Sequence, residues 1–176
     1  MLTTPRVALR EFTEADDENL FELDGDPEVM RYLTGGVPST REYVRGAIGR
    51  IEAMRVKYGG RFGFWAATLR ESNAFMGWFH FRPAKNDPEN LRRIELGYRM
   101  KRAFWGKGLA TEVSMALIEK GFAELGVEEV FAVALKQNLA SQRVMQKCGL
   151  KFVREYEDDD FLFMPGTLME YAKPRP

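Results

Sequence analysis

The chain has 176 residues, 45% of them hydrophobic, and a single cysteine, Cys148. No linker or repeat divides it, so we expect one domain over residues 1–176 with one well-buried core. The 26 basic and 26 acidic residues give a formal net charge of zero, which argues against a nucleic-acid coat protein. No apolar run reaches the length of a membrane span or of the core of a signal peptide. A single cysteine cannot form an internal disulfide. We therefore expect a cytoplasmic protein.

The first third predicts one strand followed by three helices. Residues 7–12 alternate as in a strand, Thr13 begins a typical capped helix start, and Pro27 begins a short second helix. After the Gly35-Gly-Val-Pro38 break, Ser39-Thr-Arg-Glu42 should cap a long third helix. The apolar face of that helix consists of Val44, Ala47, Ile48, Ile51, Met54 and Tyr58.

The middle third predicts strands over residues 62–69, 75–81 and 94–100. The last of them runs into Trp105-Gly-Lys-Gly-Leu-Ala-Thr-Glu-Val113, and a helix follows. Glycines 106 and 108 let the main chain adopt positive φ, so its N–H groups can approach a ligand. The unpaired N–H groups at the helix start add to this and favour an anion such as a pyrophosphate. The apolar face of the helix consists of Leu109, Val113, Ala116, Leu117 and Phe122.

Two familiar phosphate-binding motifs are excluded at this loop. The dinucleotide fingerprint needs a third small residue where Thr111 stands, inside a β-α-β unit. The nucleotide-triphosphate loop needs Ser or Thr after Gly-Lys, and Gly108 follows Lys107.

The last third predicts a strand over residues 130–133, a short helix from Asn138 to Gly149, and a hairpin of residues 151–155 with 168–172. Asn138 and Ser141 should lie beside the glycine loop that follows the strand of residues 94–100. An asparagine at the start of a helix is, however, more often a helix cap than a ligand contact. Gly149 should stop the helix. Its buried side should consist of Leu139, Val144 and Met145.

Together these segments resemble the GNAT superfamily of acyl-coenzyme A N-acyltransferases, especially the ribosomal-protein N-terminal (Rim-type) acetyltransferases. The superfamily's pyrophosphate loop, Arg/Gln-x-x-Gly-x-Gly/Ala, falls on Trp105 to Ala110. The branch's Asn-x-x-Ser with a later Lys-x-Gly falls on Asn138, Ser141, Lys147 and Gly149. Residues 7–13 and 26–32 are also similar to that branch, so the resemblance covers nearly the whole chain.

The resemblance implies an α/β (α+β) fold. This is a mixed, mostly antiparallel sheet flanked by helices, with two central strands splayed around the pantetheine arm of the coenzyme. It also implies acetyl-coenzyme A as co-substrate, with main-chain N–H groups around Tyr98 to Met100 polarising the acetyl carbonyl. The implied coenzyme-binding residues are Tyr98, Met100, Trp105, Gly106, Lys107, Gly108, Leu109, Ala110, Thr111, Asn138 and Ser141.

The sequence departs from the superfamily at two positions. Trp105 stands in place of the usual Arg or Gln, so positive charge for the phosphates must come from Lys107, Arg102 or the main chain alone. Met145 stands where many relatives carry a tyrosine that reprotonates the departing thiolate, so that role is vacant or has moved.

Basic residues are in excess around the expected phosphate loop, which suits a polyanionic coenzyme. The alternative is an ordinary solvated surface. From residue 82 to 107 the basic residues are Arg82, Lys85, Arg92, Arg93, Arg99, Lys101, Arg102 and Lys107, against Asp87, Glu89 and Glu95.

Glu95 is the expected general base for the attacking amine. It shares a strand face with Gly97, which leaves a gap for an amine or a relaying water. The alternative is an ion pair across the sheet with a basic residue. His80, the only histidine, is a weaker candidate because an isolated histidine among aromatic residues is more often structural. No ligand-like spacing predicts a metal site.

Ser141 is the expected donor to the departing thiolate, with helix capping as the alternative. Cys148 should be a small buried hydrophobe rather than a nucleophile. The predicted activity is direct acetyl transfer to a primary amine, most plausibly a protein N-terminal α-amine. The alternatives are a small amine (polyamine, aminoglycoside or amino acid) and a non-catalytic acyl-coenzyme A sensor.

The remaining expectations concern partners. The acidic run Glu155-Tyr-Glu-Asp-Asp-Asp160 could attract a cationic acceptor or could be a solvated turn. No nucleic-acid or membrane partner is expected. Homodimerisation is common in the resembled branch, but no residue of this chain establishes it.

Overall fold

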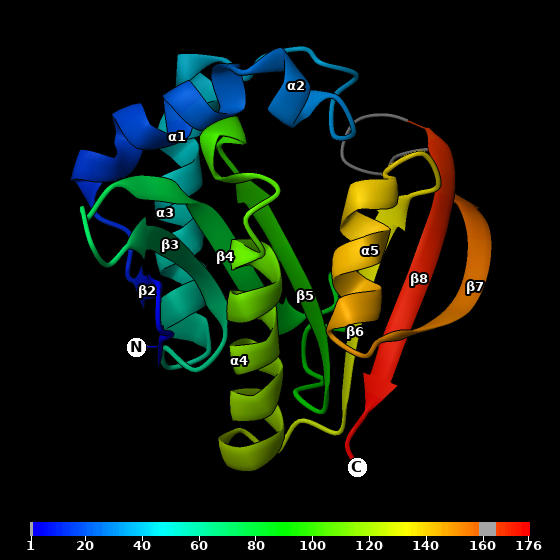
Figure 1. The fold of residues 1–176 in the computed structure, drawn as a ribbon. Coiled ribbons are helices and arrows are strands. Elements are labelled where there is room, and N and C mark those ends of the chain that lie inside the picture. The colour runs from blue at the N-terminus through cyan, green and yellow to red at the C-terminus, as the bar shows by residue number, and fades with distance from the viewer. Residues whose placement is uncertain (1, 159–164) are drawn as a thin grey trace. The chain divides into compact units, whose positions relative to one another are not determined.

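The computed structural model describes residues 2–158 and 165–176 (Figure 1). Its strands form one sheet in the order β1-β2-β3-β4-β5-β6-β8-β7. The strands are β1 (Leu2–Thr3), β2 (Val7–Arg10), β3 (Gly63–Leu69), β4 (Phe75–Pro83), β5 (Arg93–Met100), β6 (Glu129–Leu135), β7 (Lys151–Asp158) and β8 (Gly166–Pro174). The helices are η1 (Glu14–Asp16), α1 (Asp17–Gly25), α2 (Pro27–Met30), α3 (Arg41–Lys57), η2 (Arg102–Phe104), α4 (Leu109–Glu124) and α5 (Leu139–Lys147).

The described chain falls into two compact units. Unit 1 consists of Met1–His80 and Tyr98–Leu109, and unit 2 of Phe81–Gly97 and Ala110–Pro176. Strands β4 and β5 contribute residues to both units. The number of domains stays a prediction.

In unit 1, β2 pairs antiparallel with β3, from Val7↔Leu69 to Arg10↔Ala66. Helix α3 begins after Thr40, whose side chain accepts a hydrogen bond from the Tyr43 N–H at 3.2 Å, and it packs on β3. A core cluster between the helices and the sheet excludes water from the apolar side chains of both layers. The cluster comprises Leu20, Leu23, Val29, Val44, Ala66 and Phe75.

The end of β5 lies unusually close to β4 in unit 1, at Gly77. The backbone of Gly77 has φ +143°, and a Cβ atom there would lie 2.0 Å from the carbonyl oxygen of Arg99. The Lys101 N–H donates to the carbonyl oxygen of Met76 at 2.8 Å. Only glycine can occupy position 77 without displacing the end of β5.

In unit 2, β6 pairs in parallel with β5 on one side and antiparallel with β8 on the other. The β5–β6 pairing runs only from Arg93↔Glu129 to Glu95↔Phe131, although β6 continues to Leu135. The resemblance implied two splayed central strands, and this early end of the pairing agrees with it. Helix α5 lies beside β6 and β8 (Figure 1).

The predicted elements are confirmed, with shifted ends and one residue, Leu139, wrongly placed on the buried side of its helix. The last hairpin is longer than expected, and Asp159 and Asp160 of the acidic run lie outside the described residues. On α5, Met145 is buried as expected, but Leu139 is 57% exposed. Gln142 is buried on that helix instead, because its side-chain amide donates to the carbonyl oxygens of Leu135 and Lys136. Among the described residues, no helix combines the length and apolar character that crossing a membrane requires.

Candidate functional site

The expected coenzyme loop has the backbone that its glycines predict. Gly106 has φ +72° and Gly108 has φ +76°, both in the left-handed region, and α4 begins at Leu109. A Cβ atom at Gly106 would meet nothing within 4 Å, so the space on that side of its Cα atom is open. The first N–H groups of any α-helix have no partner inside that helix. The loop therefore suits an anionic group.

Trp105 attaches this loop to the end of β5. Its indole Nε1–H donates to the carbonyl oxygen of Met100 at 2.8 Å, while the side chain is 47% exposed. An indole carries no charge, so this residue orients the loop and does not replace the electrostatic role of Arg or Gln.

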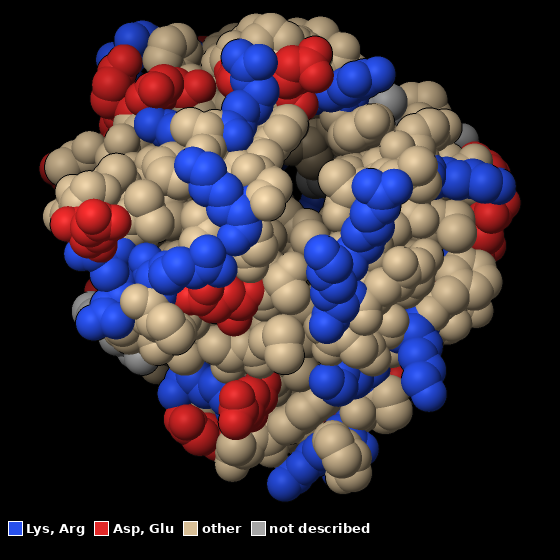
Figure 2. Space-filling view, in the orientation of Figure 1, with Lys and Arg blue, Asp and Glu red and all other residues tan. Residues whose placement is uncertain are grey.

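The basic excess around the loop is mostly compensated by acidic partners. Arg102, one proposed source of charge, pairs with Asp26 through Nε and Oδ2 at 2.7 Å. On the face shown in Figure 2, some basic side chains lie beside acidic ones and others lie among uncharged residues. Six of the eight basic residues form ion pairs: Arg82, Arg92, Arg93, Arg99, Lys101 and Arg102.

Arg6 is a cation beside the loop that the sequence interpretation missed. Its Nη1 donates to the carbonyl oxygen of Lys107 at 3.0 Å. Its Nη2 lies 3.7 Å from where a Cβ of Gly108 would be. The two segments are about a hundred residues apart in the chain, so no local motif could have indicated this contact. Arg6 and Lys107 thus bring two positive charges to the loop.

The Asn138 segment forms the start of α5. The Asn138 side chain accepts the backbone N–H of Ser141 at 3.1 Å, so the capping interpretation of Asn138 is confirmed. Ser141 is the third residue of the helix, and both interpretations of its side chain, the donor to the thiolate and the helix cap, stay predictions. At the other end, Gly149 has φ +82° and ends the helix, as predicted.

Within unit 2, the end of α5 lies against the first turn of α4. The Cys148 Sγ is 3.8 Å from the carbonyl oxygen of Thr111, and Cys148 is 2% exposed. Burial raises the pKa of the Cys148 thiol to about 11, which disfavours the reactive thiolate. Cys148 is therefore a buried packing residue, as expected. Met145 is buried, and its thioether has no exchangeable hydrogen, so the side chain at position 145 cannot donate a proton.

Glu95 faces Arg82 across the β4–β5 pair. Arg82 Nη2 lies 2.7 Å from Glu95 Oε2, and both side chains are largely buried. Burial raises the pKa of Glu95 above its ordinary value of 4.5, against the attraction of Arg82, Lys85 and Arg93. The expected alternative, an ion pair across the sheet, is thus present. The raised pKa also brings Glu95 closer to the range that suits a general base at neutral pH.

His80 lies inside an aromatic group in unit 1. Its ring stacks on Trp78 with centroids 5.9 Å apart and meets Phe64 edge-on at 5.1 Å. His80 is 8% exposed. This surrounding fits the structural interpretation of the histidine better than a role as base.

The sequence-predicted site residues divide between the two units. Unit 1 holds Tyr98, Met100, Trp105, Gly106, Lys107, Gly108 and Leu109, whereas unit 2 holds Glu95, Ala110, Thr111, Asn138 and Ser141. Within residues 2–158 and 165–176, no group of three or more His, Cys, Asp or Glu side chains is placed to hold a metal ion.

Comparison with known proteins identifies the family. Residues 6–151 match the family described as "Acetyltransferase (GNAT) domain". The N-acetyltransferase YoaA of Bacillus subtilis, itself uncharacterised, is 30% identical over 181 residues, which cover 99% of this chain and 98% of YoaA.

A second relative is the FsC-acetyl coenzyme A-N(2)-transacetylase of Aspergillus fumigatus, 31% identical over 159 residues. That match covers 88% of this chain, which spans 66% of the fungal protein's length. Among solved structures, the ribosomal L7/L12 alpha-N-protein acetyltransferase RimL in complex with coenzyme A has a TM-score of 0.80. It is 15% identical, and the match covers 98% of this chain and 96% of RimL.

Proposed function

Because the chain belongs to the GNAT acetyltransferase family and is an acetyl-coenzyme A-dependent N-acetyltransferase, we propose that its acceptor is the α-amine of a protein N-terminus. Support comes from the Rim-type motifs at Asn138, Ser141, Lys147 and Gly149, and from the chain-long likeness in fold to a protein acetyltransferase. A small amine is the alternative acceptor that the sequence leaves open.

In this proposal Glu95 takes the proton from the ammonium group of the acceptor, directly or through a water. The observation that carries the assignment is the buried Glu95 carboxylate, whose pKa is raised by that burial. An α-amine has a pKa near 8, so most of it is protonated at neutral pH and needs a base before it can attack. Arg82, at 2.7 Å, holds the carboxylate in one orientation.

The same proposal places acetyl-coenzyme A on the loop from Trp105 to Thr111. The left-handed glycines and the α4 start would receive its phosphates, with Arg6 and Lys107 supplying charge. Acetyl-coenzyme A supplies the activated acetyl thioester. The main-chain N–H groups from Tyr98 to Met100 would polarise the acetyl carbonyl, and the close β4 contact at Gly77 holds this segment in place.

Ser141 is the proposed donor toward the departing thiolate, because Met145 has no exchangeable proton. Ser141→Ala should lower kcat more than it raises the KM for acetyl-coenzyme A. Asn138→Ala is the matched variant, because it removes the helix cap and should cost about 1 kcal/mol of unfolding free energy. A Ser141→Ala enzyme with unchanged kcat would remove the assignment.

The acceptor is tested by thiol release from acetyl-coenzyme A with a panel of amines. The panel contains peptides with a free N-terminus, the same peptides with a blocked N-terminus and an internal lysine, spermidine and an aminoglycoside. We expect the free N-terminal peptides to have the highest kcat/KM. A higher value for spermidine or the aminoglycoside would favour the small-amine alternative, and release with blocked peptides alone would indicate lysine side chains.

A further inference from the structure

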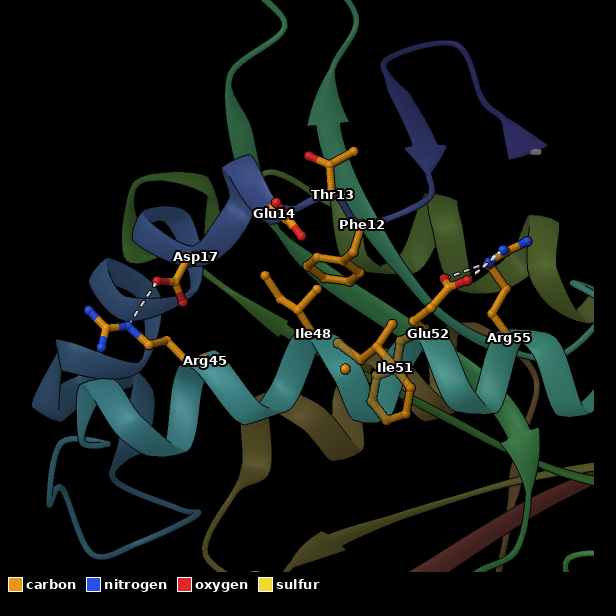
Figure 3. A pocket seen from close by; sticks show the side chains of 11 residues that line it. Phe12, Thr13, Glu14, Asp17, Arg45, Ile48, Ile51, Glu52 and Arg55 are labelled. Carbon is orange, nitrogen blue, oxygen red and sulfur yellow. Dashed lines mark hydrogen bonds and ion pairs between the residues drawn. The ribbon is translucent and has the colours of Figure 1, made fainter.

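Unit 1 contains a cavity of about 560 Å³ between the segment after β2 and helix α3 (Figure 3). Phe12, Ile48 and Phe64 form its apolar part. Figure 3 shows Asp17 with Arg45 at one end and Glu52 with Arg55 at the other. The volume lies in the usual range for small-molecule sites. None of the lining residues belongs to those assigned above to acetyl transfer.

The wall of the cavity on α3 includes a residue without a side chain. Gly49 lies inside the helix, where glycine costs roughly 0.5–1 kcal/mol relative to alanine. A Cβ atom at Gly49 would meet nothing within 4 Å. On the inner side, Phe12 and Ile48 pack against the core cluster of unit 1, so the apolar part of the wall is held in place.

The charges at the two ends of the cavity are compensated unequally. Arg55 pairs with Glu52 at 2.7 Å and with Glu11 at 3.4 Å, so that end is closed by its own ion pairs. At the other end, Asp17 Oδ2 lies 3.8 Å from Arg45 Nε, beyond hydrogen-bond distance. Asp17 Oδ1 is buried and has no hydrogen-bond partner among the described residues.

Glu14 adds a second carboxylate to the Asp17 end. It lines the cavity, and the described part of the chain gives its side chain neither a hydrogen bond nor an ion pair. Two carboxylates thus lie at this end of the cavity. Arg45, which pairs with Asp17, has a side chain that is 70% exposed. Arg41 also attracts Asp17, but it is already paired with Glu18 at 2.8 Å. This end of the cavity has an excess of negative charge beside an apolar surface.

We propose that this cavity binds a small monoamine with an aryl or alkyl body. The ammonium group would lie beside Asp17 and Glu14, and the body between Phe12, Ile48 and Phe64. Asp17 and Glu14 would repel a carboxylate or phosphate ligand, and a neutral ligand would offer Asp17 at most an uncharged donor, which binds a carboxylate more weakly than an ammonium group does. The inference does not depend on the proposed acceptor or on Glu95.

Binding of three compounds of equal size tests the proposal in the absence of acetyl-coenzyme A. The compounds are 2-phenylethylamine, 2-phenylethanol and phenylacetate, titrated by calorimetry and followed by amide NMR shifts of residues 12–17 and 45–52. We expect the amine to bind at least tenfold more tightly than the alcohol and phenylacetate not to bind. Equal binding of amine and alcohol, tighter binding of phenylacetate, or no binding of the amine would overturn the proposal.

Two pairs of variants locate the bound amine. Asp17→Asn should lower the affinity for the amine at least tenfold. Glu18→Gln, on the same helix but outside the cavity, should leave that affinity unchanged. Gly49→Leu should fill the cavity and abolish binding without loss of thermal stability, because leucine is the better helix former. Ala53→Leu adds the same side chain to an exposed position of α3 and should leave binding intact. Amine affinity unchanged in Gly49→Leu would show that the amine binds elsewhere.

Discussion

Two carboxylates of this molecule face an arginine at the same distance, yet their pKa values move in opposite directions. Asp16 lies 2.7 Å from Arg10 in unit 1, and Glu95 lies 2.7 Å from Arg82 in unit 2. The pKa of Asp16 is lowered from 3.8 to about 2, whereas the pKa of Glu95 is raised above 4.5.

Burial disfavours the charged form of both carboxylates and so raises both pKa values. The two differ in the hydrogen bonds and charges that act against this effect. Asp16 accepts two bonds from Arg10, one from the Thr13 N–H at 3.0 Å and one from Asn19 at 3.0 Å. Together these outweigh the burial and lower the pKa. For Glu95, burial outweighs the attraction of the surrounding cations. An arginine at 2.7 Å therefore does not by itself decide in which direction the pKa of a carboxylate moves.

The largest expected effect is on catalysis. Glu95→Gln keeps size and most hydrogen bonding but loses basicity, so kcat should fall about a hundredfold, or ~2.7 kcal/mol. The loss should shrink as pH rises toward the pKa of the acceptor amine, because free amine then becomes available. Steady-state kinetics from pH 6 to 9 measures both effects. Glu129→Gln, which alters an ion pair with Arg93 on the adjacent strand, is the control. Wild-type turnover of Glu95→Gln would exclude Glu95 as the base.

The matching change at Asp16 should act on stability. Asp16→Asn should lower the free energy of unfolding by about 2 kcal/mol, because the pKa difference between the unfolded and folded states is worth about that much. Chemical denaturation at pH 7 checks this, and kcat per folded molecule should be unchanged. Glu71→Gln, at an exposed turn, should have little effect.

The pH dependence follows from the lowered pKa of Asp16. Its stabilising contribution is fully present above about pH 4 and is lost as the pH falls from 3.8 toward about 2. The difference in unfolding free energy between wild type and Asp16→Asn should therefore vanish over that interval. A difference that stays constant down to pH 2 would contradict the assigned pKa.

A loss of kcat at Glu95 must be distinguished from a loss of affinity for the coenzyme, which we expect from a change in the glycine loop. Gly108→Val places a branched side chain at φ +76°, and we expect acetyl-coenzyme A to bind at least tenfold more weakly, about 1.4 kcal/mol. Calorimetry measures the affinity. Gly126→Val carries the same kind of strain, at φ +73°, away from the loop. Equal affinities in the two variants would remove the loop from the coenzyme site.

The smallest effect should come from Arg82→Lys. Lysine keeps the charge but loses the planar fork that orients the Glu95 carboxylate, so kcat should fall about threefold, near the value of one hydrogen bond. The acidic limb of the pH profile should also move. A purely structural Arg82 would lower thermal stability and leave that limb in place.

Local chemistry allowed much of the fold to be predicted from the sequence. The α4 and α5 starts, the left-handed glycines 106 and 108, and the Gly149 helix end all depend on residues within a few positions of one another. The wrong placement of Leu139 on the buried side of α5 has a different cause. Leu139 was assigned by periodicity, but a strand carbonyl several residues away gives Gln142 a reason to be buried.

By itself, the sequence determined the order of the elements, the left-handed glycines of the loop before α4 and the membership of an acetyltransferase family, because each depends on neighbouring residues in the chain. Only the tertiary structure decided which groups lie beside each charged side chain. It placed Arg6 against Lys107, Arg82 against Glu95, and Asp17 beside a cavity with an arginine beyond hydrogen-bond distance. The free energy of a charge depends on its burial and on every donor around it, and residues distant in the chain supply both.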